Sequence, residues 1–140
     1  MNTPTRPVRS RGVLLAASVA VSLASLVGCD ARDAKALTTV RSELALLKAP
    51  AGMEPVDENV GLGEMYAEGS RTYCAADEKA GQAALDGMLR DAGWKPLSTT
   101  TTVEGTSWRY GKGRHLGSLR LETAPQHCGR RFRVDVVEEL

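Results

Sequence analysis

The sequence has few of the residue types on which hydrolytic active sites depend. It has only two histidines, His115 and His127, and both occur in polar segments beside turns. Its serines give these imidazoles no obvious partner, because none lies in the strand-to-helix turn that forms a nucleophile elbow. We therefore expect no catalytic triad. The serines nearest to predicted strands are Ser70, Ser98, Ser107 and Ser118.

Aromatic side chains and net charge are also low. The six aromatic residues all fall between Tyr66 and Phe132, which places the folded core in the C-terminal two-thirds of the chain. The net charge is +1, but three arginines and no acids lie in residues 1–28. The remainder therefore has 15 basic and 17 acidic side chains, a net charge of −2. This near-neutral balance argues against a nucleic-acid partner.

No stretch of the sequence is a clear membrane-spanning segment. The uncharged stretch 13–27 is shorter than the roughly 20 apolar residues that cross a bilayer comfortably. Arg6, Arg9 and Arg11 precede it and small residues end it, the three-part pattern of a secretory signal. Ser10 separates the last two arginines, so the twin-arginine pair is absent and general export is favoured. The alternatives are an uncleaved membrane helix and cleavage at an ordinary small-residue site.

The residues Leu26-Val27-Gly28-Cys29 close this apolar stretch. They resemble the lipobox of bacterial lipoproteins, in which Leu, a small or β-branched residue, and Gly or Ala precede a lipidated Cys. The resemblance implies that residues 1–28 are a lipoprotein signal peptide and that Cys29, carrying a diacylglyceryl thioether, becomes the first mature residue. Its lipid would hold the protein on the extracytoplasmic side of the cell membrane.

The two other cysteines, Cys74 and Cys128, form an even pair once Cys29 is assigned to the lipid. In an oxidising compartment such a pair predicts a disulfide. The bond would close a loop of about 55 residues, for which the chain-entropy model predicts roughly 4 kcal/mol of stabilisation. The alternatives are two free thiols, or a metal site with His115 and His127. Because these four residues lack the close spacing of zinc ligands, we expect the disulfide and no metal site.

Apolar residues at helical spacing predict two helices. The first covers residues 33–48 and is followed by a loop over residues 49–63, which is rich in turn and breaker residues. The second begins after Cys74 and ends at Gly93, the residue type that most often adopts the left-handed conformation after a helix. We expect the first helix to pack on the domain, because its polar face mixes acidic with basic residues. The alternative is that it lies at the membrane.

Alternating apolar and polar residues predict strands joined by short turns, with Gly111-Lys112-Gly113 as one hairpin turn and a loop at residues 124–127. The alternation favours an antiparallel sheet with one covered and one solvated face. The fold class that we expect is α+β, a small antiparallel sheet of about four strands with two helices packed on one face. The strands are predicted at residues 65–73, 99–110, 114–123 and 131–136.

These elements divide the chain into three parts. Residues 1–28 form the signal peptide, residues 29–63 carry the lipidated Cys, the first helix and a loop, and residues 64–140 form the α+β domain with its disulfide. The Tyr-Cys strand end, the helix ending in Leu-Arg-Asp-Ala-Gly-Trp and the Lys-Gly turn are similar to small secreted lipoproteins of high-GC bacteria. That resemblance covers much of residues 44–138 and implies the fold without an activity.

Basic and aromatic residues near the predicted hairpin form a candidate interaction face. If the strands pair as expected, several of them would gather on the solvated face of the sheet and contact an anionic partner. The alternative is an ordinary solvated face whose charges are balanced by nearby acids. The candidate residues are Trp108, Arg109, Tyr110, Lys112 and Arg114.

The sequence thus predicts a membrane-anchored extracytoplasmic lipoprotein that is not an enzyme and needs no cofactor. We expect a non-catalytic interaction module of the cell envelope, with the membrane, through its lipid, and an envelope protein or cell-wall component as partners. The alternative is a small-ligand-binding protein or an enzyme with a pocket between sheet and helices. A cavity where Glu68, His115 or Arg109 converge would favour that alternative. An exposed patch around Trp108 and Tyr110 would favour the interaction module.

Overall fold

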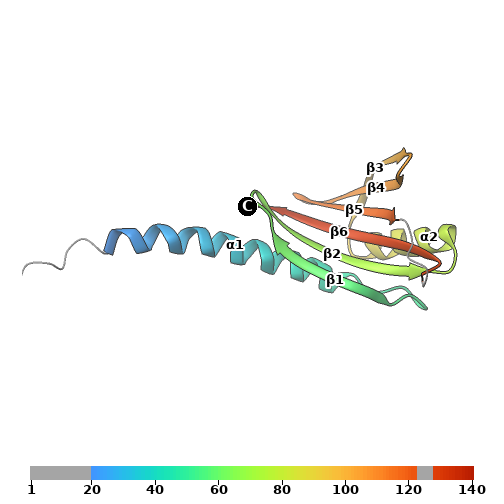
Figure 1. The fold of residues 1–140 in the computed structure, drawn as a ribbon, viewed down its shortest axis with the longest axis horizontal. Helices are drawn as coiled ribbons and strands as arrows, with labels where there is room; N and C mark the ends of the chain where they lie inside the picture. The colour runs from blue at the N-terminus through green and yellow to red at the C-terminus, as the bar shows by residue number, and fades with distance from the viewer. Residues whose placement is uncertain (1–19, 123–127) are drawn as a thin grey trace, which may run out of the picture.

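The computed structural model describes residues 20–122 and 128–140, with side chains from residue 31 onward. In these ranges two helices lie against an antiparallel sheet of six strands (Figure 1). The signal peptide up to residue 19, the side chain of Cys29 and the loop 124–127 with His127 lie outside what is described. The elements are α1 (Ala20–Leu46), β1 (Pro55–Leu62), β2 (Tyr66–Ala75), α2 (Glu78–Asp91), β3 (Lys95–Thr102), β4 (Gly105–Lys112), β5 (His115–Glu122) and β6 (Arg130–Glu139).

The strands follow the order β1-β2-β6-β5-β4-β3, and every neighbouring pair is antiparallel. The last strand of the chain, β6, therefore lies inside the sheet between β2 and β5. The predicted α+β class, with two helices and an antiparallel sheet, is confirmed. The expected number of about four strands was wrong, because the described residues form six.

The first additional strand is β1, which occupies residues that were predicted to form a loop. Nearly all of its side chains are exposed, so its sequence has no apolar alternation to indicate a strand. It forms because the edge of β2 offers unpaired backbone groups, which an extended segment can satisfy. Pro55 begins the strand, next to an irregularity in register before Asp57.

The second additional strand arises where the predicted strand 99–110 folds back on itself. Its two halves are β3 and β4, with Thr102 opposite Gly105. Gly105 has a φ of 138°, which a residue with a side chain rarely adopts. The next hairpin turn is also displaced from the prediction, because β4 continues to Lys112 and the turn begins at Gly113, whose φ is 59°.

Helix α1 packs on β1, β2 and β6 through its C-terminal half. It begins earlier than the predicted 33–48 and ends at Leu46. Its buried side chains Val40 and Leu44 lie above Gly69 of β2, where no side chain intervenes. Two polar contacts add to this apolar one. Lys112 pairs with Glu43 at 2.8 Å, and Arg71 donates to the backbone carbonyl of Leu47 at 2.9 Å.

Helix α2 is capped at both ends. The Asp77 side chain accepts a hydrogen bond from the backbone N–H of Ala80 at 2.7 Å. At the other end Gly93 has a φ of 90°, and the backbone N–H of Trp94 donates to the Leu89 carbonyl at 2.9 Å. Trp94 thereby folds back under the helix, where it is buried.

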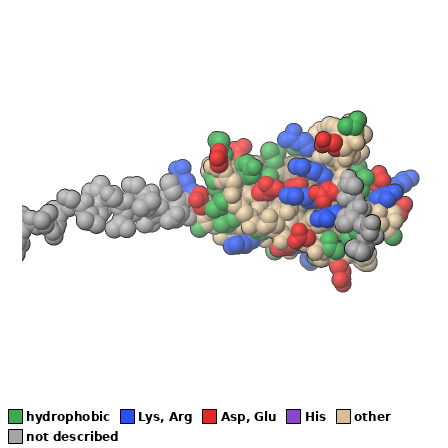
Figure 2. Space-filling view, viewed as in Figure 1, with side chains coloured by type: hydrophobic (Ala, Val, Ile, Leu, Met, Phe, Trp, Pro, Cys, Tyr) green, Lys and Arg blue, Asp and Glu red, His purple; other side chains and the backbone are tan. Residues whose placement is uncertain are grey.

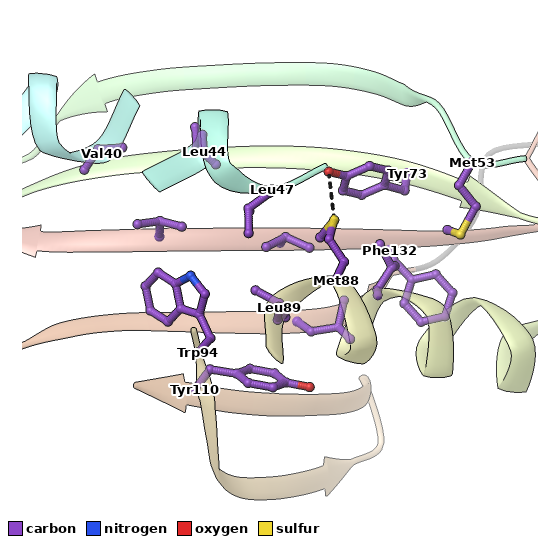
Figure 3. Close-up of a cluster of buried hydrophobic side chains, with 14 of the residues drawn as sticks. Val40, Leu44, Leu47, Met53, Tyr73, Met88, Leu89, Trp94, Tyr110 and Phe132 are labelled. Carbon is purple, nitrogen blue, oxygen red and sulfur yellow. Dashed lines mark hydrogen bonds between the residues drawn. The ribbon is translucent and has the colours of Figure 1, made fainter. Parts of the chain in front are cut away.

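Both helices cover the same face of the sheet and share one core (Figure 3). Gly69 of β2 faces α1 and Ala75 of the same strand faces Gly81 of α2. These two β2 residues are an even number of positions apart in a regular register, so their side chains point to one face. Tyr73 lies between them and donates from its hydroxyl to Met88 Sδ at 3.6 Å. Within the described ranges, neither helix is long and apolar enough to cross a membrane.

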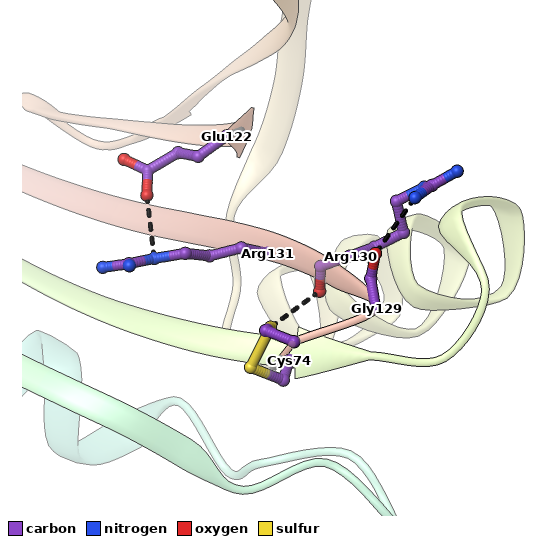
Figure 4. Close-up of a disulfide and its surroundings, with 6 residues drawn as sticks. Cys74, Glu122, Gly129, Arg130 and Arg131 are labelled. Carbon is purple, nitrogen blue, oxygen red and sulfur yellow. Dashed lines mark hydrogen bonds and ion pairs between the residues drawn. A yellow bond between two sulfur atoms is a disulfide. The ribbon is translucent and has the colours of Figure 1, made fainter. Parts of the chain in front are cut away.

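The structure joins Cys74 and Cys128 in a disulfide with a Cα–Cα distance of 5.4 Å (Figure 4). Cys74 is near the end of β2 and Cys128 shortly precedes β6, so the bond staples two neighbouring strands. It also uses both sulfurs that the alternative metal site would have needed as thiolates. The disulfide marks what we call the distal end of the sheet. The proximal end, from which α1 projects, holds the β1–β2 and β4–β5 turns and Leu140 (Figure 1).

Candidate interaction surfaces

The face of the sheet opposite the helices, which we call the outer face, is polar and uncovered by any other described element. The registers of β2, β6, β5 and β4 place alternate side chains of each strand on it. Figure 2 shows basic and acidic groups interspersed across the sheet. The principal side chains of the outer face are Glu68, Ser70, Ser107, Arg109, Ser118, Arg120, Glu122, Arg131, Arg133 and Asp135.

Asp135 lies at the centre of the outer face and is only 3% exposed. Its Oδ1 accepts from Arg133 Nε at 2.6 Å and its Oδ2 from Ser118 Oγ at 3.0 Å, with Arg120 Nε 3.5 Å away. The hydrogen bond to Asp135 raises the pKa of Arg133. A carboxylate this little exposed is tolerated because it is paired and hydrogen-bonded. Arg133 also donates to Glu68 at 3.0 Å, so the centre of the face is a fixed network of charges.

Arg109 also lies on the outer face but takes no part in this network. It is exposed, and it makes no ion pair with any side chain that the structure describes. Together with Arg120 it lines an open depression of about 720 Å³ over β4 and β5, which Ser107, Ser118, Glu104 and Glu122 also line. At the distal side of the face Arg131 is instead held by an acid, at 3.1 Å (Figure 4). The depression therefore presents one guanidinium with no described ion-pair partner and one weakly paired guanidinium, beside the carboxylates of Glu104 and Glu122.

The five residues of the predicted interaction face do not share a surface. Arg109 lies on the outer face, whereas Trp108, Tyr110 and Lys112 point to the helix-covered face, and Arg114 pairs with a buried acid at the β4–β5 turn. Tyr110 is 1% exposed. The physical reason is the two-residue period of a strand, which sends alternate positions of β4 to opposite faces. No exposed patch is therefore centred on Trp108 and Tyr110.

A groove of about 300 Å³ lies beside the half-buried Trp108, between α2 and the β3–β4 edge. Its inner wall carries Tyr110, whose hydroxyl donates to Asp86 Oδ1 at 2.6 Å. Burial and the neighbouring carboxylate raise the pKa of Tyr110 well above its usual range. Burial opposes ionisation of Asp86, but hydrogen bonds from Tyr110 and Arg90 outweigh it and lower the pKa of Asp86. Gln82 of α2 completes the polar side of this groove.

A second polar cluster lies at the proximal end. The buried carboxylate of Glu138 accepts from Arg114 at 2.7 Å and is hydrogen-bonded to His115 Nδ1. Sequence reasoning missed Glu138. The available signal was its place in the alternation of β6, where an acid follows Val134 and Val136 at an inward position. A cavity of about 290 Å³ beside it is lined by Arg32 and Lys35 of α1, with Ala36, Arg114, Glu139 and Leu140.

The polar residues named as markers of a catalytic or ligand pocket do not converge. Glu68 and Arg109 lie on the outer face, whereas His115 points to the helix side. Over residues 31–122 and 128–140, no group of three or more His, Cys, Asp or Glu side chains is placed to hold a metal ion. Comparisons with protein-family models, curated proteins and solved structures find no match to this chain.

Proposed function

We propose that this protein is a membrane-anchored extracytoplasmic lipoprotein that acts as a non-catalytic interaction module of the cell envelope. The observation that carries the proposal is the position of Cys29 in α1. The same continuous helix leads into the core, where Ala36 is buried. At 1.5 Å per residue, Cys29 and Ala36 are about 10 Å apart along the helix. A lipid on Cys29 would thus hold the domain at the bilayer surface without a flexible tether.

The surface that we propose for the envelope partner is the depression around Arg109 on the outer face. Arg120 borders the same depression and is only weakly held by Asp135, so two guanidinium groups can turn toward a ligand. Guanidinium groups bind carboxylates and phosphates in a bidentate geometry. An acidic segment of an envelope protein or an anionic cell-wall polymer carries groups that these guanidinium groups could bind.

The anchor is tested by replacing Cys29 with Ala in the full chain, expressed in a bacterium that processes lipoproteins. We expect the variant to lack the lipid and to leave the membrane fraction for the soluble fraction after export. Ser25→Ala, which changes the leader but spares the four lipobox residues, is the matched control. Full membrane retention of Cys29→Ala with normal processing would contradict the anchor.

The binding face is tested with a photo-crosslinking amino acid at position 109 of the full chain in intact cells. Position 79, an exposed lysine on α2, is the control because it lies on the helix side of the domain. We expect one discrete adduct from position 109 and none from position 79, with a several-fold lower yield when Arg120→Glu is added. Equal adduct patterns at both positions would overturn the outer face as the binding surface and leave the anchor intact.

A second candidate function, binding of a small ligand, is supported by the groove beside Trp108. An indole next to converging polar groups, here Gln82, Asp86 and Arg90, is a common composition for ligand sites. Titration of the full chain with soluble cell-wall glycan fragments would test it through tryptophan fluorescence. A saturable change that Trp108→Phe abolishes supports this function, and a change that Trp108→Phe leaves intact contradicts it.

A further inference from the structure

The proximal end of the domain carries exposed apolar side chains that nothing in the described fold covers. Met65 is 76% exposed and Tyr66 42% exposed, both at the β1–β2 turn. The backbone N–H of Leu140 donates to the Met65 carbonyl at 3.1 Å, so the end of the chain lies against the same turn. Leu62, which ends β1, is also exposed. We call Leu62, Met65, Tyr66 and Leu140 the apolar rim.

Cationic side chains stand beside the apolar rim. Arg32 and Lys35 of α1 are exposed and make no ion pair with a described side chain. Arg114, which pairs with Glu138, reaches the same place from the β4–β5 turn. Arg32, Lys35 and Arg114 line one cavity with Glu138, Glu139 and Leu140. Figure 2 shows hydrophobic, basic and acidic side chains together where the helix leaves the domain. Apolar and basic groups side by side are typical of surfaces that contact a membrane interface.

The position of Cys29 decides what this surface would face. Arg32 is about 4.5 Å and Lys35 about 9 Å further along the helix from Cys29. The headgroup layer on each side of a bilayer is roughly 5–8 Å thick. A lipid on Cys29 therefore places both cations at or just above the depth of the phosphates, and brings the apolar rim to the same surface.

We propose that the proximal end of the domain docks on the bilayer that holds the lipid anchor. In this arrangement the apolar rim inserts among the headgroups, and Arg32 and Lys35 bind the phosphates of anionic phospholipids. The inference rests on the proposed function, because the lipid on Cys29 selects which end meets the membrane. In this orientation the strands run away from the bilayer surface and the disulfide end points away from it. The outer face stays accessible to a partner.

Depth-dependent quenching of a tryptophan reporter tests the docking. The full lipidated chain carrying Met65→Trp is reconstituted into vesicles of phosphatidylcholine and phosphatidylglycerol, with and without brominated acyl chains. Val103→Trp is the matched control, since Val103 is also highly exposed to solvent but lies in the β3–β4 turn at the distal end. After subtraction of the wild-type signal, we expect several-fold quenching of the reporter at 65 and none at 103.

The contribution of the cations is tested by adding Arg32→Glu and Lys35→Glu to the Met65→Trp chain. We expect the quenching to fall several-fold. The control pair Arg41→Glu with Lys48→Glu, on α1 and just past its end and further from Cys29, should leave it unchanged. Vesicle flotation separates the two proposals. A chain that floats, yet is quenched no more at 65 than at 103, overturns docking and leaves the anchor standing. A wild-type chain that does not float overturns both.

Discussion

Gly69 of β2 lies directly beneath Val40 of α1, with no room for a side chain between them. A Cβ atom at Gly69 would lie 2.4 Å from Val40 Cγ1 and 2.7 Å from Leu44 Cδ1. The helix that leads to Cys29 can therefore pack closely on the sheet, because one strand position there is bare backbone. This contact couples the proposed anchor to the core of the domain.

Replacing Gly69 with Ala is expected to destabilise the protein. The added methyl group must push α1 away from the sheet, and overpacking of this kind costs about 1–3 kcal/mol. Urea unfolding of the purified full chain measures the loss. Gly61→Ala, on the neighbouring strand β1, is the control because no atom lies within 4 Å of its Cβ position. Equal stability changes for both variants would show that α1 does not pack as described.

Replacement of two glycines of α2 with alanine is expected to change the stability of the protein in opposite directions. Gly87 has open space around its Cβ position, so Gly87→Ala should stabilise the helix by about 0.5–1 kcal/mol. At Gly81 a Cβ would lie 2.6 Å from Ala75 Cβ and 2.8 Å from Phe132 Cε2. There the overpacking cost of about 1–3 kcal/mol exceeds the gain in helix propensity. Thermal unfolding checks both signs, and stabilisation by Gly81→Ala would contradict the packing of α2.

Because the phenol of Tyr110 is buried, the stability of the protein is expected to fall as the pH rises into the alkaline range. Its pKa is raised by burial and by Asp86, so the unfolded chain releases this proton first as pH rises. Stability is complete below the ordinary tyrosine pKa of 10.0 and falls above it, by up to about 1.4 kcal/mol per pH unit. Tyr110→Phe should flatten this fall in urea unfolding between pH 9 and 11, roughly the range around that ordinary value. Tyr66→Phe is the control at an exposed site, and an unchanged slope in Tyr110→Phe would contradict the prediction.

The bond between Cys74 and Cys128 is expected to contribute about 4 kcal/mol to the free energy of unfolding. A chain with Cys74→Ser and Cys128→Ser should lose that amount, and reductant should destabilise the wild type but not the double variant. Mass analysis of the unreduced protein checks the bond itself. Two thiols that alkylate freely before reduction would contradict it.

The parts of the fold that could be predicted are those with local periodic signals. Leu85, Met88 and Leu89 recur at helical spacing and form the buried stripe of α2. Phe132, Val134 and Val136 alternate along β6 and are all buried. β1 had no such signal, because its side chains stay exposed on an edge strand whose stability comes from pairing with β2. The threonine-rich β3, with every side chain exposed, was merged with β4 for the same reason.

The candidate site was less predictable than the fold. Trp108 and Arg109 are adjacent in sequence but lie on opposite faces of β4, so a cluster of residues in the sequence was not a cluster in space. The fixed network around Asp135 unites strands β2, β5 and β6. It depends on β6 lying between β2 and β5, and the linear sequence does not indicate that order.

By itself, the sequence determined the α+β class, the two helices, the alternation of the later strands and the pairing expected of two cysteines. Each of these follows from spacing or composition within short segments or from a simple count. Only the tertiary structure decided the strand order, the six-stranded sheet and the face on which each charged or aromatic side chain lies. These properties depend on which strands pair with each other along their edges. The packing of the whole chain determines that pairing.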